Sequence, residues 1–286
     1  MIKERSYSHL LELNLAVLFI STSGVLGRYI DLPVPLTIFL RALLASLFLM
    51  IYIYYKKYSL RVLSEDRKML ILSGIFMGLH WITYFYSLQV SNVAIAVISL
   101  YTFPVITAFL EPLLLKTNFH KSHLVSGFLV VLGVYILTPE IDWDSDYFKG
   151  AAIGVLSALC YALRNIIIKP KVHSYNQSSL MLFQMVIVTV ILSPAAFYIN
   201  IETVKPFAPA LLSLALVTTV LGHTMFVKSL RFFSASSASL ISSMQPLYGI
   251  LLAYLFLNEV PGLHTFVGGT LVVSAVLLES IKSRAA

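Results

Sequence analysis

Several polar and aromatic side chains stand in the middle of long apolar segments, where a polar group is costly unless it has partners. His80, Trp81 and Tyr84 lie near the centre of one such segment, and Tyr101 lies near the centre of the next. Their chemistry is hydrogen bonding and ring stacking. Apolar walls with a few converging polar groups are typical of a small-molecule site. We therefore interpret them as candidate substrate-binding residues, together with Arg41, Tyr161, Asn165, His223 and Gln245.

Spacing groups some of these side chains into pairs. His80 and Tyr84 are four residues apart, as are Tyr161 and Asn165, so the members of each pair share one face of a helix. Packing alone is the competing interpretation for every ring. His80 and His223 are the only mid-depth groups that titrate near neutral pH, which leaves proton coupling through a histidine open.

Arg41 is the charged member of the set, and it has two interpretations: a structural anchor or a contact to a substrate carboxylate. An arginine in mid-helix costs about 3 kcal/mol in a membrane. Arg164 and Lys228 are expected near helix ends, where long side chains extend toward the membrane surface. Because no carboxylate is expected at mid-depth, we predict a largely neutral ligand and no sodium site. A permanent cation is less favoured, although ring contacts leave it open.

Enzyme motifs are missing from the sequence. It has no nucleotide-binding glycine loop, no zinc-type His/Cys spacing and no nucleophile elbow. We therefore predict no catalytic residue, no metal site and no cofactor. One alternative is an intramembrane enzyme such as a lipid-head-group transferase, which would place paired acids near one membrane face. A channel is the other, but the sequence has no filter motif.

The segments that carry these residues predict an all-α integral membrane protein. Apolar residues make up 58% of the chain and charged residues 12%, against about 25% charged in soluble proteins. About 20 apolar residues cross the bilayer as a helix, and the runs are continuous rather than alternating, which excludes strands. By that measure we expect ten spans, at roughly 10–29, 36–55, 69–88, 92–115, 121–138, 150–169, 179–198, 207–229, 235–257 and 262–280.

The second half of the chain repeats the first. Pro104 corresponds to Pro246, and Ser87-Leu88 to Ser229-Leu230, all at an offset of 142 residues. With a slip of one residue, Leu40-Arg41 aligns with Phe183-Gln184, and Ser23-Gly24 with Arg164-Asn165. We predict two repeats, 1–140 and 141–286, in one membrane domain. Each repeat has a mid-span proline that removes a helical hydrogen bond, so Pro104 and Pro246 are predicted hinges.

Basic residues predict the orientation. Fourteen of them lie in loops on one side of the predicted spans and three on the other, so both termini are expected in the cytoplasm. This distribution also accounts for the net charge of +7 without a nucleic-acid partner. Five spans per repeat is an odd number, so the second repeat enters the membrane upside down. Binding sites of inverted-repeat transporters lie at the repeat interface near the midplane, which predicts a central cavity.

The whole pattern resembles the EamA type of the drug/metabolite transporter superfamily. The resemblance covers nearly the whole chain and rests on the five-plus-five spans, on Arg41 early in span 2 and on Pro104 in span 4. It also rests on the segment from Met244-Gln245-Pro246 to Asn258-Glu259. The resemblance implies a basket of helices around a central cavity, alternating access, and substrates such as amino acids, nucleotide-like compounds or drugs.

These observations together predict a secondary transporter of small organic metabolites, with amino acids or related compounds and export as the first expectation. Import of a nucleotide-like metabolite such as S-adenosylmethionine is the alternative. The expected partners are the substrate, the lipid bilayer and, as an open option, protons. The expected location is a bacterial inner membrane, as a monomer or a homodimer.

Overall fold

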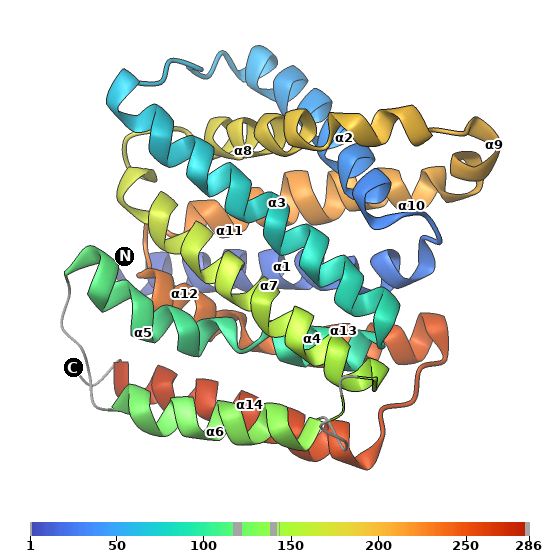
Figure 1. Cartoon of the computed structure of the whole chain (residues 1–286). Helices are drawn as coiled ribbons and strands as arrows, with labels where there is room; N and C mark the ends of the chain where they lie inside the picture. Colours follow the sequence, from blue (N-terminus) through green and yellow to red (C-terminus); the bar gives the residue numbers. More distant parts are fainter. Residues whose placement is uncertain (1, 117–121, 138–141, 143, 284–286) are drawn as a thin grey trace.

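The computed structural model describes residues 2–116, 122–137, 142 and 144–283, and within these residues it contains helices and no strand. The longer helices are α1 Ile2–Tyr29, α2 Val34–Lys56, α3 Arg67–Val90, α5 Phe103–Leu115, α6 Ser122–Leu137, α7 Asp146–Ile168, α8 Gln177–Ile191, α13 Gln245–Leu257 and α14 Leu263–Ser283. The shorter ones are α4 Val93–Leu100, α9 Ile201–Val204, α10 Ala208–Ser213, α11 Thr224–Ser229 and α12 Ala235–Ile241. They form one bundle around a shared core (Figure 1).

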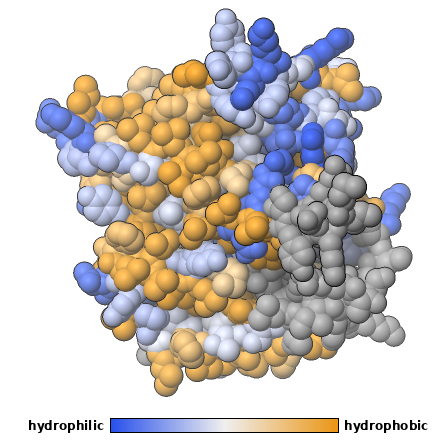
Figure 2. Space-filling model, turned by 180° about the vertical axis from the view of Figure 1, so that it is seen from behind, coloured by the Kyte–Doolittle hydropathy of each residue, from blue (hydrophilic) through white to orange (hydrophobic). Residues whose placement is uncertain are grey.

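Length and composition make this a membrane bundle. Within the described residues, six helical segments are long and apolar enough to span a bilayer: His9–Tyr29, Val34–Lys56, Ser64–Val90, Val93–Leu115, Asp146–Lys171 and Ile201–Ser229. Four shorter helical stretches are also apolar: Gly127–Ile136, Gln177–Ile191, Gln245–Leu257 and Leu263–Ala275. Hydrophobic residues cover the middle of one face, and hydrophilic residues gather toward its two edges (Figure 2). The chain is therefore an integral, multi-pass membrane protein.

Two of the predicted spans differ clearly from these helices. α1 begins at Ile2, well before the expected start at residue 10. The expected span at 179–198 ends early, because α8 stops at Ile191 and a 3₁₀ turn over Ser193–Tyr198 follows. Pro194 lies in the first turn of that 3₁₀ segment and lacks the N–H that a continuing α-helix would need. The predicted boundary between the repeats, at 140 and 141, lies outside the described residues.

Both helices with a mid-span proline are broken where the proline predicts. α4 ends at Leu100, and α5 begins at Phe103 with Pro104 in its first turn. In the second half, a 3₁₀ turn over Ser242–Met244 separates α12 from α13, and Pro246 lies in the first turn of α13. Proline fits a first helical turn, where its missing N–H would have no partner in any case.

Each broken helix also caps the other. Glu259, which follows α13, accepts a hydrogen bond of 2.9 Å from the N–H of Val93, the first residue of α4. Glu111 of α5 accepts hydrogen bonds from the N–H groups of Ala235 and Ser236 at the start of α12, at 3.2 and 3.0 Å. A carboxylate satisfies the free N–H groups of a helix start and matches the helix dipole there.

Small residues allow the helices around the centre to approach closely. Gly74 and Gly78 of α3 face Ile187 and Val188 of α8. A Cβ atom at Gly74 would lie 2.8 Å from the Cβ atom of Ile187, which is closer than real side chains pack. This contact keeps α3, which carries three candidate residues, against α8.

Candidate functional site

All nine candidate residues lie inside the bundle. The most exposed of them, Gln245, is 7% exposed, and Arg41 is 0% exposed. They come from α2, α3, α7, α13, the break between α4 and α5, and the segment before α11. Residues far apart in the sequence therefore meet in one core.

Aromatic rings connect most of the set. Tyr161 contacts several of them: its ring centroid lies 4.4 Å from that of His80, 4.9 Å from that of Phe103 and 6.2 Å from that of His223. Phe103 in turn lies 5.3 Å from Tyr101. The rings occupy the centre of the bundle, so the structure holds a packed arrangement at the place where the sequence predicts a cavity. The larger grooves, of about 580, 620 and 670 Å³, lie elsewhere, and none of the nine candidate residues lines them.

His80 is fixed by a reciprocal contact with Ser157 of α7. The Ser157 hydroxyl donates to the backbone carbonyl of His80 at 2.8 Å, and His80 Nδ1 lies 2.8 Å from the same hydroxyl oxygen. Since the single hydroxyl hydrogen goes to the carbonyl, Nδ1 must be the donor in the second contact. The remaining nitrogen, Nε2, is left as the acceptor of the ring.

Arg41 lies on the face of Trp81, with its guanidinium carbon 3.7 Å from the ring centroid. Its Nε donates to Thr219 Oγ1 at 2.8 Å, and its Nη1 donates a long hydrogen bond of 3.4 Å to Ser23 Oγ. Its Nη2 has no hydrogen-bond partner. The side chain is fully buried and is held by contacts inside the bundle.

The position of Thr219 depends on a π-helical segment over Leu214–His223 that the sequence did not predict. Thr219 donates to the carbonyl of Leu214 at 2.9 Å, five residues back. Short π-helical stretches occur often at functional sites. Here the segment turns Thr219 toward Arg41 and ends at His223, whose ring lies 5.5 Å from Trp81. The Nδ1 atom of His223 has no partner.

Arg164 corrects one expectation. It was expected to extend toward a membrane surface, but it is fully buried in α7. Its Nε and Nη2 donate to Gln184 Oε1 at 3.1 and 2.6 Å, and its Nη1 donates to Asn165 Oδ1 at 2.8 Å. Gln184 then donates to Ser73 Oγ at 3.1 Å. The prediction was wrong because acceptors inside the bundle satisfy the guanidinium without water.

The two arginines occupy matched contacts. In the repeat alignment Ser23 corresponds to Arg164, and Arg41 corresponds to Gln184. In the structure Arg41 donates to Ser23, and Arg164 donates to Gln184. The same pair of aligned positions is therefore in contact in each half, but the arginine occupies one position of the pair in the first half and the other position in the second. The alignment was therefore the signal that could have identified Arg164 and Gln184 as core residues. Sequence reasoning had no comparable signal for Thr219 or Ser157.

Tyr101 and Gln245 connect the two helix breaks. The Tyr101 hydroxyl donates to the carbonyl of Ser242 and lies 3.3 Å from Gln245 Oε1. Tyr101 ends the first half of one broken helix, and Gln245 begins the second half of the other. The candidate site thus includes both breaks.

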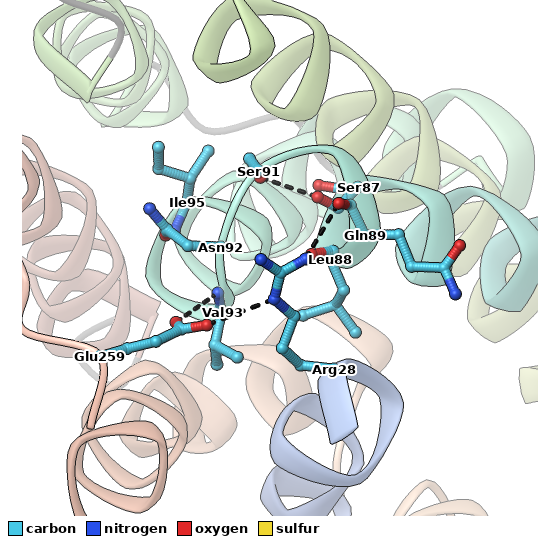
Figure 3. A network of polar contacts seen from close by, with 9 residues as sticks. All are labelled: Arg28, Ser87, Leu88, Gln89, Ser91, Asn92, Val93, Ile95 and Glu259. Atoms are coloured by element: carbon cyan, nitrogen blue, oxygen red, sulfur yellow. Dashed lines mark hydrogen bonds and ion pairs between the residues drawn. The ribbon is translucent and has the colours of Figure 1, made fainter. Parts of the chain in front are cut away.

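Polar contacts join the helices at one end of the bundle. Arg28 of α1 donates to the carbonyls of Leu88 and Gln89 at 3.0 and 2.9 Å. It also forms an ion pair of 3.5 Å with Glu259, the residue that caps α4 (Figure 3). We call this the Glu259 end.

Other contacts join the helices at the end where α1 begins and α14 ends, which we call the terminal end (Figure 1). Lys169 donates to the carbonyl of Leu230 at 2.6 Å, and Lys228 pairs with Glu12 at 2.6 Å. Tyr175 donates to Asp66 at 2.6 Å, and this carboxylate raises the pKa of the Tyr175 hydroxyl. Polar contacts therefore bridge the helices at both ends of the bundle, and the candidate residues are buried between them.

Comparison with known proteins agrees with this architecture. The model of the EamA-like transporter family matches residues 10–138 and 148–281. The chain belongs to the EamA-like transporter family. It is thus a transporter of the drug/metabolite type, with a small-molecule substrate and the lipid bilayer as its surroundings.

Individual relatives are distant but match along most of their length. A pseudopaline exporter, CntI, of Pseudomonas aeruginosa is 22% identical over 92% of this chain and 93% of its own. An S-adenosylmethionine uptake transporter of Rickettsia bellii is 23% identical over 84% of this chain and 81% of its own. A solved crystal structure has the same fold, with a TM-score of 0.71, 13% identity, and coverage of 97% and 99% of the two chains. These EamA relatives include both an exporter and an importer.

Proposed function

We propose that this EamA transporter carries small organic metabolites outward by alternating access, with amino acids and related compounds as the first candidates. One observation carries the proposal: rings and hydrogen-bonding groups from both halves of the chain converge on the two helix breaks. Tyr161 contacts His80 and Phe103 there, and Tyr101 connects to Ser242 across the halves. Rings can stack on apolar parts of a ligand, while amide, hydroxyl and imidazole groups fix its orientation.

The proposal includes ten membrane spans in two inverted repeats, 1–140 and 141–286. The matched polar contacts support it. Arg41 reaches α1 and the π-helical segment, through Ser23 and Thr219. Its counterpart Gln184 reaches α7 and α3, through Arg164 and Ser73. A two-fold relation between the halves would place the contacts of Arg41 and those of its counterpart Gln184 on corresponding helices. Inverted repeats of that kind serve alternating access in many carriers.

Movement is proposed to occur at the helix breaks. Pro104 and Pro246 interrupt the two helices that cap each other, so a change of angle at one break alters contacts at both ends of the bundle. Opening the Glu259 end would separate Glu259 from Arg28 or from α4. Opening the terminal end would separate Glu111 from α12. The central residues would then face one side at a time.

The orientation we propose has the terminal end in the cytoplasm of a bacterial cell. Basic side chains concentrate at this end, among them Lys56, Lys57, Arg61, Lys169 and Lys171. Positively charged loops are retained on the cytoplasmic side of a membrane. The 139–149 linker, of which the structure describes residues 142 and 144–149, would then face outward.

Uptake of a nucleotide-like compound is the second candidate, because one relative is named as an S-adenosylmethionine uptake transporter. The packed rings around Tyr161 could stack on a nucleobase as well as on an aromatic amino acid. The direction of flux distinguishes the two candidates.

The test is a metabolite profile of cells and medium, with and without overexpression, followed by transport in proteoliposomes. We expect one or a few metabolites to accumulate in the medium of expressing cells. Purified protein should then release the same labelled compounds from loaded vesicles. His80→Ala should slow release several-fold without loss of protein, whereas the exposed Tyr54→Phe should not. Accumulation inside the cells instead would favour uptake, and an unchanged profile with no vesicle flux would reject the transport proposal.

A further inference from the structure

We propose that Arg41 binds an acidic group of the substrate, so that the compounds carried by this protein are organic anions, with carboxylates as the first class. The inference rests on the transport function proposed above and narrows its substrate class. It departs from the largely neutral ligand that the sequence alone predicted. The observation that carries it is a fully buried Arg41 with a terminal nitrogen that has no hydrogen-bond partner.

Arg41 is a buried cation without an anion. Its side chain is 0% exposed, and among the described residues no carboxylate lies within salt-bridge distance of it. Its contacts are the rings of Trp81 and Phe85, the hydroxyl of Thr219 and, at 3.4 Å, the hydroxyl of Ser23. An uncompensated buried charge is strongly destabilising, and such residues inside membranes mark substrate or ion sites. The natural partner of a guanidinium is a carboxylate or a phosphate, which can accept two parallel hydrogen bonds.

Arg41 has a donor available for that purpose. Nη2 makes no hydrogen bond, and Nη1 makes only the long contact to Ser23. The two terminal nitrogens of a guanidinium can bind a carboxylate in a bidentate manner, with two parallel hydrogen bonds. Nε is occupied by Thr219, which holds the plane of the group against Trp81. Nη2 is therefore without a hydrogen bond and Nη1 has only a long one, so this pair of nitrogens is available to a carboxylate.

Arg164 provides the internal comparison. It is equally buried, but Nε, Nη1 and Nη2 all donate to acceptors within the bundle. Its acceptors are the neutral amides of Gln184 and Asn165, so its positive charge is solvated but not cancelled. Arg164 is thus a fixed structural cation that makes the core more attractive to anions, whereas Arg41 is the cation with a free donor.

Two further candidate residues also have buried polar atoms without a hydrogen-bond partner. Asn165 Nδ2 is a donor without a partner, because the Oδ1 atom of this amide is taken by Arg164. His223 Nδ1 is also without a partner, and its ring packs against the same Trp81 that Arg41 covers. Buried polar groups in proteins are normally satisfied. A ligand with an oxygen acceptor at Arg41 and a polar group beside His223 would satisfy the two residues that pack against Trp81.

The experiment uses purified protein in proteoliposomes and pairs of compounds that differ only in charge. The probes are N-acetyl-leucine against N-acetyl-leucinamide, N-acetyl-tryptophan against its amide, and glutamate against glutamine. We expect uptake or release of the acid in at least one pair to exceed that of its amide by about 10- to 100-fold, the range for a charge-assisted contact. Metabolites found in the expression profile are added with their amides.

Variants assign the preference to Arg41. Arg41→Gln should abolish the preference for acids over amides. Arg41→Lys retains the positive charge but not the paired donors of the guanidinium, and it should retain part of the preference. Lys228→Gln is the matched control, because it removes a cation that is 45% exposed at the terminal end and should leave the preference intact. If Arg41→Gln does not fold, the Arg41→Lys protein and the acid–amide ratio of the parent still decide the question.

The outcomes separate the two proposals. Equal transport of acids and amides by the parent protein would overturn the anion inference while leaving the transport function in place. Retention of the acid preference in Arg41→Gln would overturn the role of Arg41. Absence of flux for every probe and every profiled metabolite would reject the transport function, and the anion inference with it.

Discussion

The hydroxyl of Tyr101 donates to the backbone carbonyl of Ser242, which connects the break of one proline-interrupted helix to the break of the other. These residues lie 141 positions apart in the sequence. The contact is buried, so no water replaces it when the hydroxyl is removed. It is therefore a sensitive point at which to test whether the two breaks act together.

Tyr101→Phe should preserve the ring packing and remove this connection. Leaving the carbonyl of Ser242 and the amide of Gln245 without the hydroxyl should cost about 1–3 kcal/mol. We expect a lower melting temperature in detergent and transport slowed several-fold. Tyr54→Phe, which alters an 87% exposed ring, is the control and should change neither. A Tyr101→Phe protein that transports at the parent rate would argue against coupling of the breaks.

Pro104→Ala and Pro246→Ala should retain the fold but slow transport, because each restores an N–H that can extend the following helix across the break. Vesicle release rates and circular dichroism of the purified variants measure the two effects. Pro206→Ala, in a 3₁₀ turn outside both broken helices, is the matched control. Parent-like rates in both variants would assign the prolines to packing.

Glu111→Ala should destabilise the start of α12, since the carboxylate accepts from two backbone N–H groups and from the hydroxyl of Ser236. Loss of such a cap costs about 0.5–2 kcal/mol. Glu111→Gln, which retains an acceptor oxygen, should lose less. Thermal unfolding in detergent compares both with Glu202→Ala, a change at an exposed acid in the short α9. A melting temperature for Glu111→Ala equal to that of the control would show that the cap contributes nothing.

The proposed orientation can be checked with single cysteines at Asp144 and Lys57 in a Cys160→Ala background. An impermeant thiol reagent should label the Asp144 site in intact cells and the Lys57 site only after permeabilisation. Cys160 is buried, so its replacement by a small residue should be tolerated. The opposite labelling pattern would reverse the orientation and place the terminal end outside.

Much of the bundle was predictable because long apolar runs and prolines have direct structural consequences. Both breaks fall where Pro104 and Pro246 predict them. The environment of Arg164 was not predicted, since depth along a helix does not say which acceptors a neighbouring helix provides.

The π-helical segment over Leu214–His223 was also not predicted. Its residues are ordinary helix formers for a membrane, and the wider turn has no compositional signature there. It is the tertiary contact between Thr219 and Arg41 that makes this geometry useful. The packed state of the rings around Tyr161 is likewise a property of the conformation and not of the residue types.

The unpartnered charge of Arg41 has an energetic consequence for the living cell. If each cycle carries one anion outward, the electrical potential of a bacterial membrane, negative inside, acts on that charge. The gain is about 2.3 kcal/mol per elementary charge at 100 mV, which corresponds to an outside excess of about 50-fold at equilibrium. A carrier with an unpartnered buried arginine and no coupling-ion gradient could therefore act as an exporter, with the membrane voltage alone as its source of energy.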